Sequence, residues 1–288
     1  MSRGTAESTK CAAIITGAAE GIGRGIALRL AKDGWDLGLF DLPRAEARLQ
    51  EHAETLEKEY GTKITTVYGD VSKEDDVKRL VETVVQEHEN LYAMIADAGS
   101  AIASYTEKIY VRARGLSSYE YAAIQIIKQG TGWRIFGAAS VASKTGKPRT
   151  ILLTCFEHVL TCCDWLTGIA LHSVYCATKF AARGLTQSAA MDYGKYGIPV
   201  NAYDPGVVET PLFHELDEYH SKQNGQPRGT WINAFTNVLG RNEQPEDVAK
   251  LVTFLVSDDA AFITGEWSRE IAVATVLIEL GTPLKGNW

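Results

Sequence analysis

The chain has few cysteines, no excess of basic residues and no long uncharged apolar run, and each lack excludes a class of protein. Five cysteines in 288 residues, with no apolar signal-peptide core in Met1–Lys10, exclude a small disulfide scaffold and predict free thiols in a reducing compartment. Twenty-nine basic against 36 acidic residues give a net charge of −7, which disfavours nucleic acid and anionic membranes as partners. The longest apolar stretch, Ile151–Ala170, carries Glu157, His158 and Asp164, which disfavour a membrane span. We therefore expect a cytoplasmic protein.

The composition is that of a globular protein, because 45% of the residues are hydrophobic and 23% are charged. Short apolar runs alternate with longer segments of helical periodicity, which is typical of a parallel sheet with crossover helices. The expected strands are Ala12–Thr16, Trp35–Phe40, Ile64–Tyr68, Leu91–Ala96, Trp133–Ala138 and Ile198–Tyr203. The expected helices include Lys73–Glu89, Tyr175–Tyr196 and Pro245–Val256.

These elements predict an α/β fold: a Rossmann-type doubly wound parallel sheet in three α/β/α layers, forming a single domain over residues 1–288. Residues 1–10 are expected to be a flexible N-terminus. Ser72 and Asp75 resemble a capping box at the start of the helix expected from Lys73, with Asp in place of Glu or Gln.

A glycine-rich loop follows the first expected strand and reads TGAAEGIG from Thr16 to Gly23. Glycines let the backbone turn tightly and approach a pyrophosphate, and the N-terminus of the next helix supplies free N–H groups. Asp41 ends the second expected strand, 18 residues after Gly23, where a carboxylate accepts hydrogen bonds from ribose hydroxyls and repels a 2′-phosphate. This arrangement predicts a dinucleotide site that favours NAD over NADP, although Arg44 nearby could weaken that preference.

Tyr175 and Lys179 lie four residues apart, which places a phenol and an ammonium on one face of a helix. A neighbouring cation stabilises the phenolate and lowers the pKa of the phenol, which then becomes a usable acid and base near neutral pH. Taken alone, the pair would be interpreted as a surface tyrosine beside a solvated lysine.

Together these motifs resemble the short-chain dehydrogenase/reductase family over about residues 10–265. The motifs occur in the family's order: TGAAEGIG, Asp70-Val71, Tyr175-x-x-x-Lys179 and PGVVET from Pro205 to Thr210. Within the family, the stretches FDLP, YAAIQIIKQG, VYCATKFAARGLTQSAA and YGIPVNAYDPGVVETPL resemble the acetoin/diacetyl reductase (2,3-butanediol dehydrogenase) group. The resemblance implies an NAD(P)-dependent oxidoreductase that transfers hydride between nicotinamide and a small carbonyl or alcohol, and that forms homodimers or homotetramers.

The resemblance also implies a set of site residues without a metal. Its catalytic residues are Ser140, Tyr175 and Lys179. Its cofactor-binding residues are Gly17, Glu20, Gly21, Ile22, Gly23, Asp41, Asp70, Val71, Ala98, Gly99, Tyr175, Lys179, Val208 and Thr210. Among these, Asp70 and Val71 would hold the adenine. Val208 and Thr210 would meet the nicotinamide carboxamide.

The catalytic roles implied by the resemblance are distinct. Tyr175 would protonate the alkoxide formed when hydride reaches a carbonyl carbon, and Ser140 would orient the substrate oxygen. Lys179 would bind the nicotinamide ribose and tune Tyr175.

The chain departs from the family pattern at two single positions. Asp97 stands where the family has the asparagine of Asn-Ala-Gly, and it adds a charge and loses a donor. Arg112, in Val111–Gly115, stands at the position of the catalytic asparagine and has no acceptor for a water relay. The segment before it, from Gly99 to Val111, looks about ten residues short, which would truncate a helix that packs between subunits in the family.

Two longer segments are also atypical. Ser140 and Tyr175 are 35 residues apart, and the excess falls at about 149–172. This insertion is interpreted as a substrate lid, as translated non-coding sequence, or, with a poor match to zinc spacing, as a metal site of Cys155, His158, Cys162 and Cys163. Residues 266–288 lack the family's Asp-Gly-Gly turn, although a seventh strand is expected at Ile271–Ile278.

Three hypotheses remain open from the sequence. The first is an active NAD(P)-dependent oxidoreductase, the second a non-catalytic nucleotide-binding protein with a disrupted site, and the third a defective product that folds poorly. Substrate specificity is expected around Leu212–Thr230, where His214, Glu215 and Tyr219 are either substrate contacts or part of a solvated helical lid.

Overall fold

Seven parallel strands form one sheet at the centre of the molecule. The structure is a computed structural model, and it describes residues 12–99, 116–130, 133–139, 173–233 and 239–269. The strand order is β3-β2-β1-β4-β5-β6-β7, and every neighbouring pair is parallel. The strands are β1 (Ala12–Thr16), β2 (Asp36–Asp41), β3 (Ile64–Tyr68), β4 (Leu91–Ala96), β5 (Arg134–Ala138), β6 (Val200–Asp204) and β7 (Trp267–Arg269).

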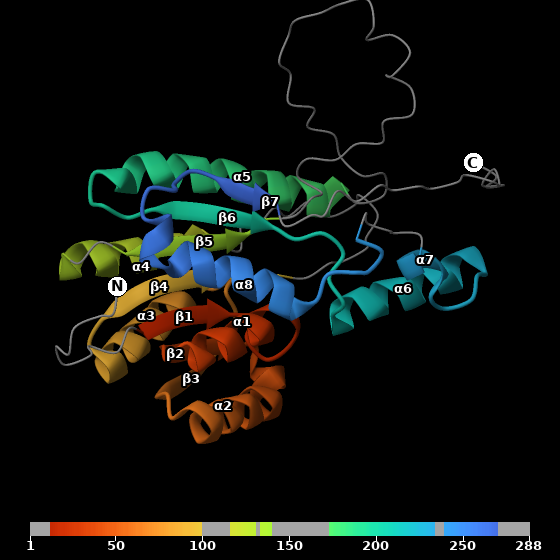
Figure 1. The fold of residues 1–288 in the computed structure, drawn as a ribbon, viewed down its shortest axis with the longest axis horizontal. Coiled ribbons are helices and arrows are strands. Elements are labelled where there is room, and N and C mark those ends of the chain that lie inside the picture. Colours follow the sequence, from red (N-terminus) through yellow and green to blue (C-terminus); the bar gives the residue numbers. More distant parts are fainter. Residues whose placement is uncertain (1–11, 100–115, 131–132, 140–172, 234–238, 270–288) are drawn as a thin grey trace, which may run out of the picture.

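Helices cover both faces of this sheet (Figure 1). The helices are α1 (Gly21–Lys32), α2 (Glu46–Tyr60), α3 (Glu74–His88), α4 (Leu116–Gln129), α5 (Ser173–Gly194), α6 (Pro211–Asn224), α7 (Thr230–Asn233) and α8 (Pro245–Val256). One core cluster joins the sheet to α1, α2 and α8, and a second joins the opposite face to α3, α4 and α5. The alternation of β1 explains this division, because Ala13 and Ile15 face the first cluster while Ala12 and Ile14 face the second. The predicted three-layer doubly wound fold is confirmed.

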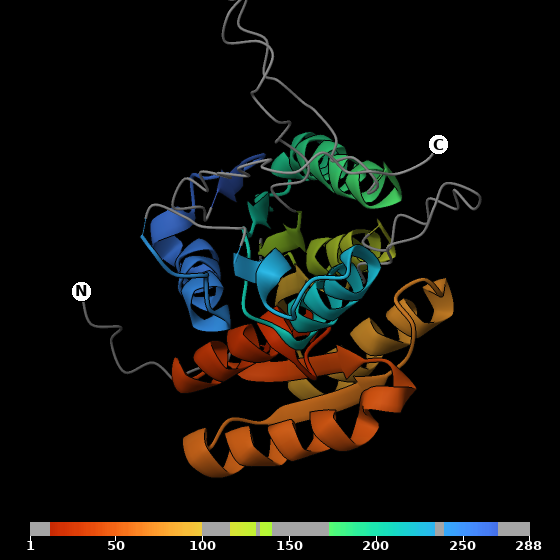
Figure 2. The same cartoon turned by 90° about the vertical axis from the view of Figure 1, so that its right-hand side faces the viewer.

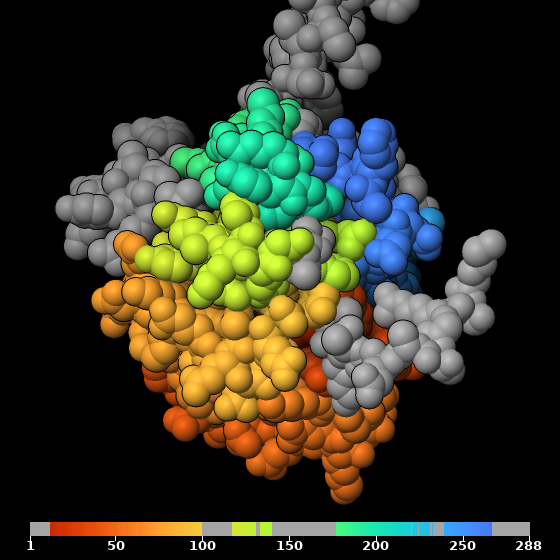
Figure 3. Space-filling model, turned by 90° about the vertical axis from the view of Figure 1, so that its left-hand side faces the viewer, coloured from red at the N-terminus to blue at the C-terminus, as the bar shows by residue number. Residues whose placement is uncertain are grey.

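The strand order reverses between β1 and β4, and ligands of such sheets bind outside the carboxyl ends of the strands at this point. Figure 1 shows α6 and α7 beyond these carboxyl ends, and Figure 2 looks onto the same end with α6 in front of the sheet. From the opposite end, Figure 3 shows the elements up to residue 99, coloured red to gold, beside the later elements, coloured yellow-green to blue. The site is therefore expected under α6.

Most predicted elements are found within two residues of their expected bounds. The capping box expected at Ser72 and Asp75 is wrong: α3 starts one residue later than expected, and its N-cap residue, Lys73, makes no side-chain cap. Two other acidic residues organise this turn instead, because Asp70 Oδ1 accepts from Ser72 N at 2.9 Å and Asp76 Oδ2 accepts from Asp70 N at 2.9 Å. The seventh strand is found at Trp267–Arg269, whereas the predicted Ile271–Ile278 lies outside the described residues.

Candidate functional site

The glycine loop forms a tight backbone cradle between β1 and α1. Gly17 has φ +74° and Gly21 has φ +60°, a region that favours glycine. A Cβ at Gly17 would lie 3.0 Å from Ala98 Cα, and a Cβ at Gly23 would overlap the carbonyl oxygen of Gly17. The cradle therefore requires glycine at these positions, which leaves room for a phosphate to approach the backbone at the start of α1.

Asp41 fixes this cradle from the end of β2. Its Oδ2 accepts from Ala19 N at 2.9 Å, and its Oδ1 accepts from Leu42 N at 2.7 Å. Each carboxylate oxygen has two lone pairs, so both oxygens can accept a further hydrogen bond from a ribose hydroxyl. Asp41 thus combines a structural role with the predicted position for ribose recognition.

Lys179 reaches the same edge of the sheet from α5. Its ammonium donates to the carbonyl oxygen of Ala138, the last residue of β5, at 2.9 Å. Tyr175 lies one turn earlier in α5, so the predicted helix is confirmed, but its side chain is outside the described residues. Ser140 also lies outside them, directly after Ala139.

Thr210 approaches the glycine loop from the segment after β6. A Cβ at Gly21 would lie 3.4 Å from Thr210 Cγ2, so the two residues are neighbours. Thr210 is also the N-cap of α6, where its Oγ1 accepts from Phe213 N at 3.3 Å. Val208, two residues earlier, is buried at 6% exposure. Two residues predicted to meet the nicotinamide thus lie on a loop that leaves β6 and contacts the cradle at Thr210, where α6 begins.

The other predicted cofactor residues follow the carboxyl ends of β1, β3 and β4. Ala98 packs on Gly17, and its N–H donates to Thr16 Oγ1 at 3.0 Å. Ile22 and Val71 are partly buried, and Asp70 follows β3. Glu20 precedes α1, and its carboxylate pairs with Arg48 of α2 at 2.8 Å on the surface. Gly99 is exposed at the end of a described segment.

Several sequence-derived expectations lie outside the described residues. They concern Met1–Lys10, Arg112 with its flanking residues, the insertion at 149–172 with its cysteines and His158, and residues 270–288. Within the described ranges, no group of three or more His, Cys, Asp or Glu side chains could hold a metal ion. In the same ranges, no helix has the length and apolarity that a membrane crossing requires.

Asp97 adds a negative charge beside the start of α1. Its Oδ1 accepts from the Tyr203 hydroxyl at 2.5 Å, and its carboxylate also accepts from the backbone N–H of Gly23. Burial raises the pKa of Asp97 to about 6, against the opposing effects of the Tyr203 hydrogen bond and the Lys179 ammonium. A carboxylate therefore occupies the N-terminal turn of α1, beside the position expected for the cofactor pyrophosphate.

Sequence reasoning singled out Asp97 but missed Tyr203. Tyr203 belongs to β6, and β5 separates that strand from β4, which Asp97 follows. The side chain reaches Asp97 across the intervening strand, so only the strand order brings the two residues together. Sequence reasoning also missed Glu243, whose carboxylate accepts from Gly206 N at 3.1 Å, because the polar residues around it in the sequence form no motif.

Comparisons with known proteins agree with this geometry. A family model described as Enoyl-(Acyl carrier protein) reductase matches residues 17–268. A short-chain dehydrogenase/reductase of Armillaria gallica is 37% identical over 88% of this chain and 92% of its own length. A diacetyl reductase [(S)-acetoin forming] of Staphylococcus epidermidis is 36% identical over 88% of this chain and 94% of its own.

A solved acetoin dehydrogenase from Salmonella typhimurium has a TM-score of 0.67 at 26% identity, covering 90% of this chain and 95% of its own. The protein is thus an oxidoreductase of the kind that acts on CH–OH and C=O groups. The chain belongs to the short-chain dehydrogenase/reductase family, as its sequence motifs predicted.

Replacing Asp97 with asparagine is expected to raise the affinity for NAD⁺ about tenfold at about pH 8, because the repulsion between carboxylate and pyrophosphate disappears. The amide keeps both contacts, since its oxygen can accept from Gly23 N–H and its NH2 can donate to the Tyr203 oxygen. Calorimetric titration across pH measures this effect. The wild type should bind more tightly as pH falls through about 6, while the variant should show a flat profile.

Asp97→Asn should also raise the free energy of unfolding, as it raises the affinity for NAD⁺. The folded-state pKa of Asp97 lies above its ordinary value, so the wild type loses stability as pH rises from the ordinary value through about 6. Asp97→Asn should therefore be more stable by about 1–2 kcal/mol at about pH 8 and similar to the wild type in acid. The exposed Asp192→Asn is the matched control for removal of one charge. Equal pH profiles in all three proteins would contradict this role of Asp97.

Proposed function

We propose that the chain is an NAD-dependent reductase of small carbonyl compounds of the diacetyl and acetoin type, working in both directions. One observation carries the proposal. The glycine cradle, the Lys179 ammonium and Thr210 converge at the carboxyl edge of the sheet, beside the point where the strand order reverses.

The described residues fit a dinucleotide. Gly17 and Gly23 form a cradle that a Cβ would fill, and the start of α1 supplies backbone donors for a pyrophosphate. Asp41 offers acceptor lone pairs to the adenosine ribose. We assign the adenine to Asp70 and Val71, and the nicotinamide end to Lys179, Val208 and Thr210.

The protein's part in the reaction is to hold the substrate oxygen and to move one proton. The nicotinamide, when bound, supplies or accepts the hydride. In reduction, Tyr175 gives its proton to the substrate oxygen as negative charge develops there, and Ser140 donates a hydrogen bond to the same oxygen. Lys179 stabilises the phenolate that remains on Tyr175. Oxidation of an alcohol reverses these steps.

The choice of substrate class is supported by the relatives rather than by the geometry. The Staphylococcus epidermidis relative is named for forming (S)-acetoin from diacetyl. The test is consumption of NADH with diacetyl, with acetoin, and with a bulky aryl ketone as the control substrate. Turnover of the first two over the third supports the proposal. Turnover confined to the aryl ketone would contradict the substrate class.

The preference for NAD rests on the charge of Asp41. Asp41→Asn is expected to narrow the preference for NADH over NADPH at least tenfold, because a 2′-phosphate no longer meets a carboxylate. The affinity for NADH itself should fall a few-fold, since the amide offers one acceptor oxygen in place of two. Dissociation constants for both cofactors measure this change. Glu46→Gln, an exposed site at the start of α2, removes the same charge and should leave the ratio unchanged.

A further inference from the structure

The loop that follows β6 is fastened to the segment that precedes α8. Val208 and Glu243 form a parallel β-bridge. The N–H of Glu243 donates to the Val207 carbonyl at 3.0 Å, and the N–H of Glu209 donates to the Glu243 carbonyl at 2.8 Å. This backbone pairing aligns the two segments whatever side chain residue 243 carries.

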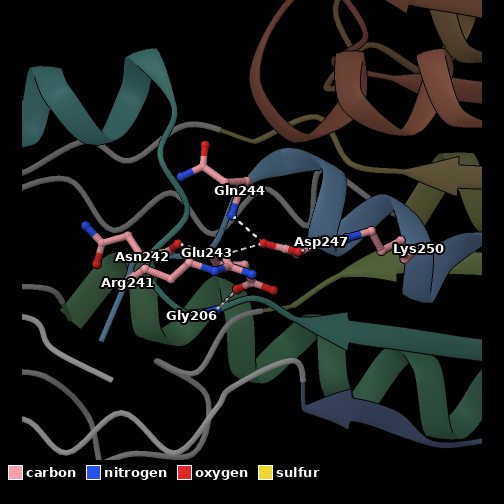
Figure 4. A network of polar contacts seen from close by, with 7 residues as sticks. All are labelled: Gly206, Arg241, Asn242, Glu243, Gln244, Asp247 and Lys250. Carbon is pink, nitrogen blue, oxygen red and sulfur yellow. Dashed lines mark hydrogen bonds and ion pairs between the residues drawn. The ribbon is translucent and has the colours of Figure 1, made fainter. Parts of the chain in front are cut away.

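Two side chains add to the backbone pairing, and Figure 4 shows the segment that carries them. Glu243 Oε2 accepts from Gly206 N at 3.1 Å, which fixes the turn where the chain leaves β6. Asn242 Nδ2 donates to Glu209 Oε1 at 2.5 Å. We call these contacts between 206–209 and 242–243 the loop clamp. The loop clamp ends one residue before Thr210.

The loop clamp is anchored to the helix that begins at the glycine cradle. Asp247 Oδ2 accepts from Gln244 N at 3.1 Å and pairs with Arg241 at 2.6 Å, so the start of α8 is held rigidly (Figure 4). A Cβ at Gly25 of α1 would lie 2.7 Å from Pro245 Cβ, which shows how closely α8 packs on α1. The loop clamp and α8 thus fix the position of the loop with Val208 and Thr210 relative to α1.

We propose that Glu243 is a positioning residue that holds the loop with Val208 and Thr210 in place for the nicotinamide half of the cofactor. This inference rests on the proposed function. Glu243 acts through Gly206 and the loop clamp. Its loss should therefore weaken the binding of the nicotinamide half of the cofactor. Binding of the adenosine half, which Asp41 and the glycine cradle hold, should be unaffected.

The experiment compares the affinities for NADH and for ADP-ribose, which contains the adenosine and pyrophosphate but lacks the nicotinamide. Glu243→Ala leaves Gly206 N without its acceptor. It should lower the affinity for NADH about tenfold and change the affinity for ADP-ribose less than about twofold. Glu243→Gln is the matched control. It removes the same charge but keeps an acceptor oxygen, and it should stay within about threefold of wild type for both ligands.

The outcomes separate this inference from the proposed function. Equal weakening of both ligands, or no change in either, overturns the role of Glu243 while leaving the cofactor site intact. A folded wild type that binds neither ligand overturns the proposed function and this inference with it. If Glu243→Ala lacks a cooperative melting transition, Asn242→Ala removes the other side-chain contact of the loop clamp. Asn242→Ala should then lower the affinity for NADH a few-fold and leave the affinity for ADP-ribose unchanged. An equal loss of affinity for both ligands overturns the proposal.

Discussion

Replacing Tyr175 with phenylalanine is expected to lower kcat about a thousandfold or more while the affinity for NADH changes less than about threefold. The expected loss follows from the role proposed for the phenol, because a positioned general acid contributes about 10²–10⁴-fold to a rate. The ring remains and only the hydroxyl is lost, so the cofactor site should keep its shape. Steady-state kinetics with diacetyl, together with NADH binding by fluorescence, measures both quantities on the same preparation.

The control for this experiment is Tyr196→Phe. Tyr196 lies just beyond the end of α5 and is 46% exposed, and its loss of a hydroxyl should leave kcat unchanged. Wild-type turnover that persists undiminished in Tyr175→Phe would overturn the proposed proton transfer. Tight NADH binding by a wild type that turns over no diketone, hydroxyketone or diol would instead favour a non-catalytic nucleotide-binding protein.

The second large effect is expected at Gly23. A methyl group there would overlap the Gly17 carbonyl oxygen and would lie 3.1 Å from Asp97 Oδ2. Because the overlapping carbonyl belongs to the cradle itself, Gly23→Ala should displace the loop and lower the affinity for NADH about a hundredfold. The overlap should also lower the free energy of unfolding by about 1–3 kcal/mol. Calorimetric titration and thermal melting measure the two effects.

Gly184→Ala provides the matched glycine control. Gly184 lies on an exposed face of α5, and a Cβ there would meet nothing within 4 Å. An alanine should therefore raise stability by about 0.5–1 kcal/mol, since it stiffens the unfolded chain and favours the helix. It should leave NADH affinity unchanged. Equal NADH affinity in Gly23→Ala and wild type would show that the cradle does not receive the cofactor.

The sheet and the glycine loop could be predicted from sequence because they depend on local patterns. Short buried runs such as Leu91–Ala96 carry their own signal, and the loop's glycines all fall within seven residues, from Gly17 to Gly23. Asp41 was predictable for the same reason, since it ends a recognisable strand at a fixed distance from the loop.

Contacts between distant segments were not predictable in this way. The bond between Asp97 and Tyr203 joins residues 106 positions apart, and Glu243 meets Gly206 across 37 positions. Each contact depends on how strands and helices are placed in space. The error at Ser72 is of a different kind, because several acidic residues compete for the same few N–H groups and a small difference in helix start decides among them.

We infer that the glycine cradle, Asp41 and Lys179 form a working cofactor site in this chain. The decisive experiment is a titration of the purified protein with NADH, which follows the fluorescence of its six tryptophans and of the cofactor. We predict saturable binding at micromolar concentrations and a melting temperature that rises with NADH, because a ligand that binds only the folded state stabilises it. A protein that melts cooperatively yet shows neither saturable binding nor a rise in melting temperature would contradict the claim.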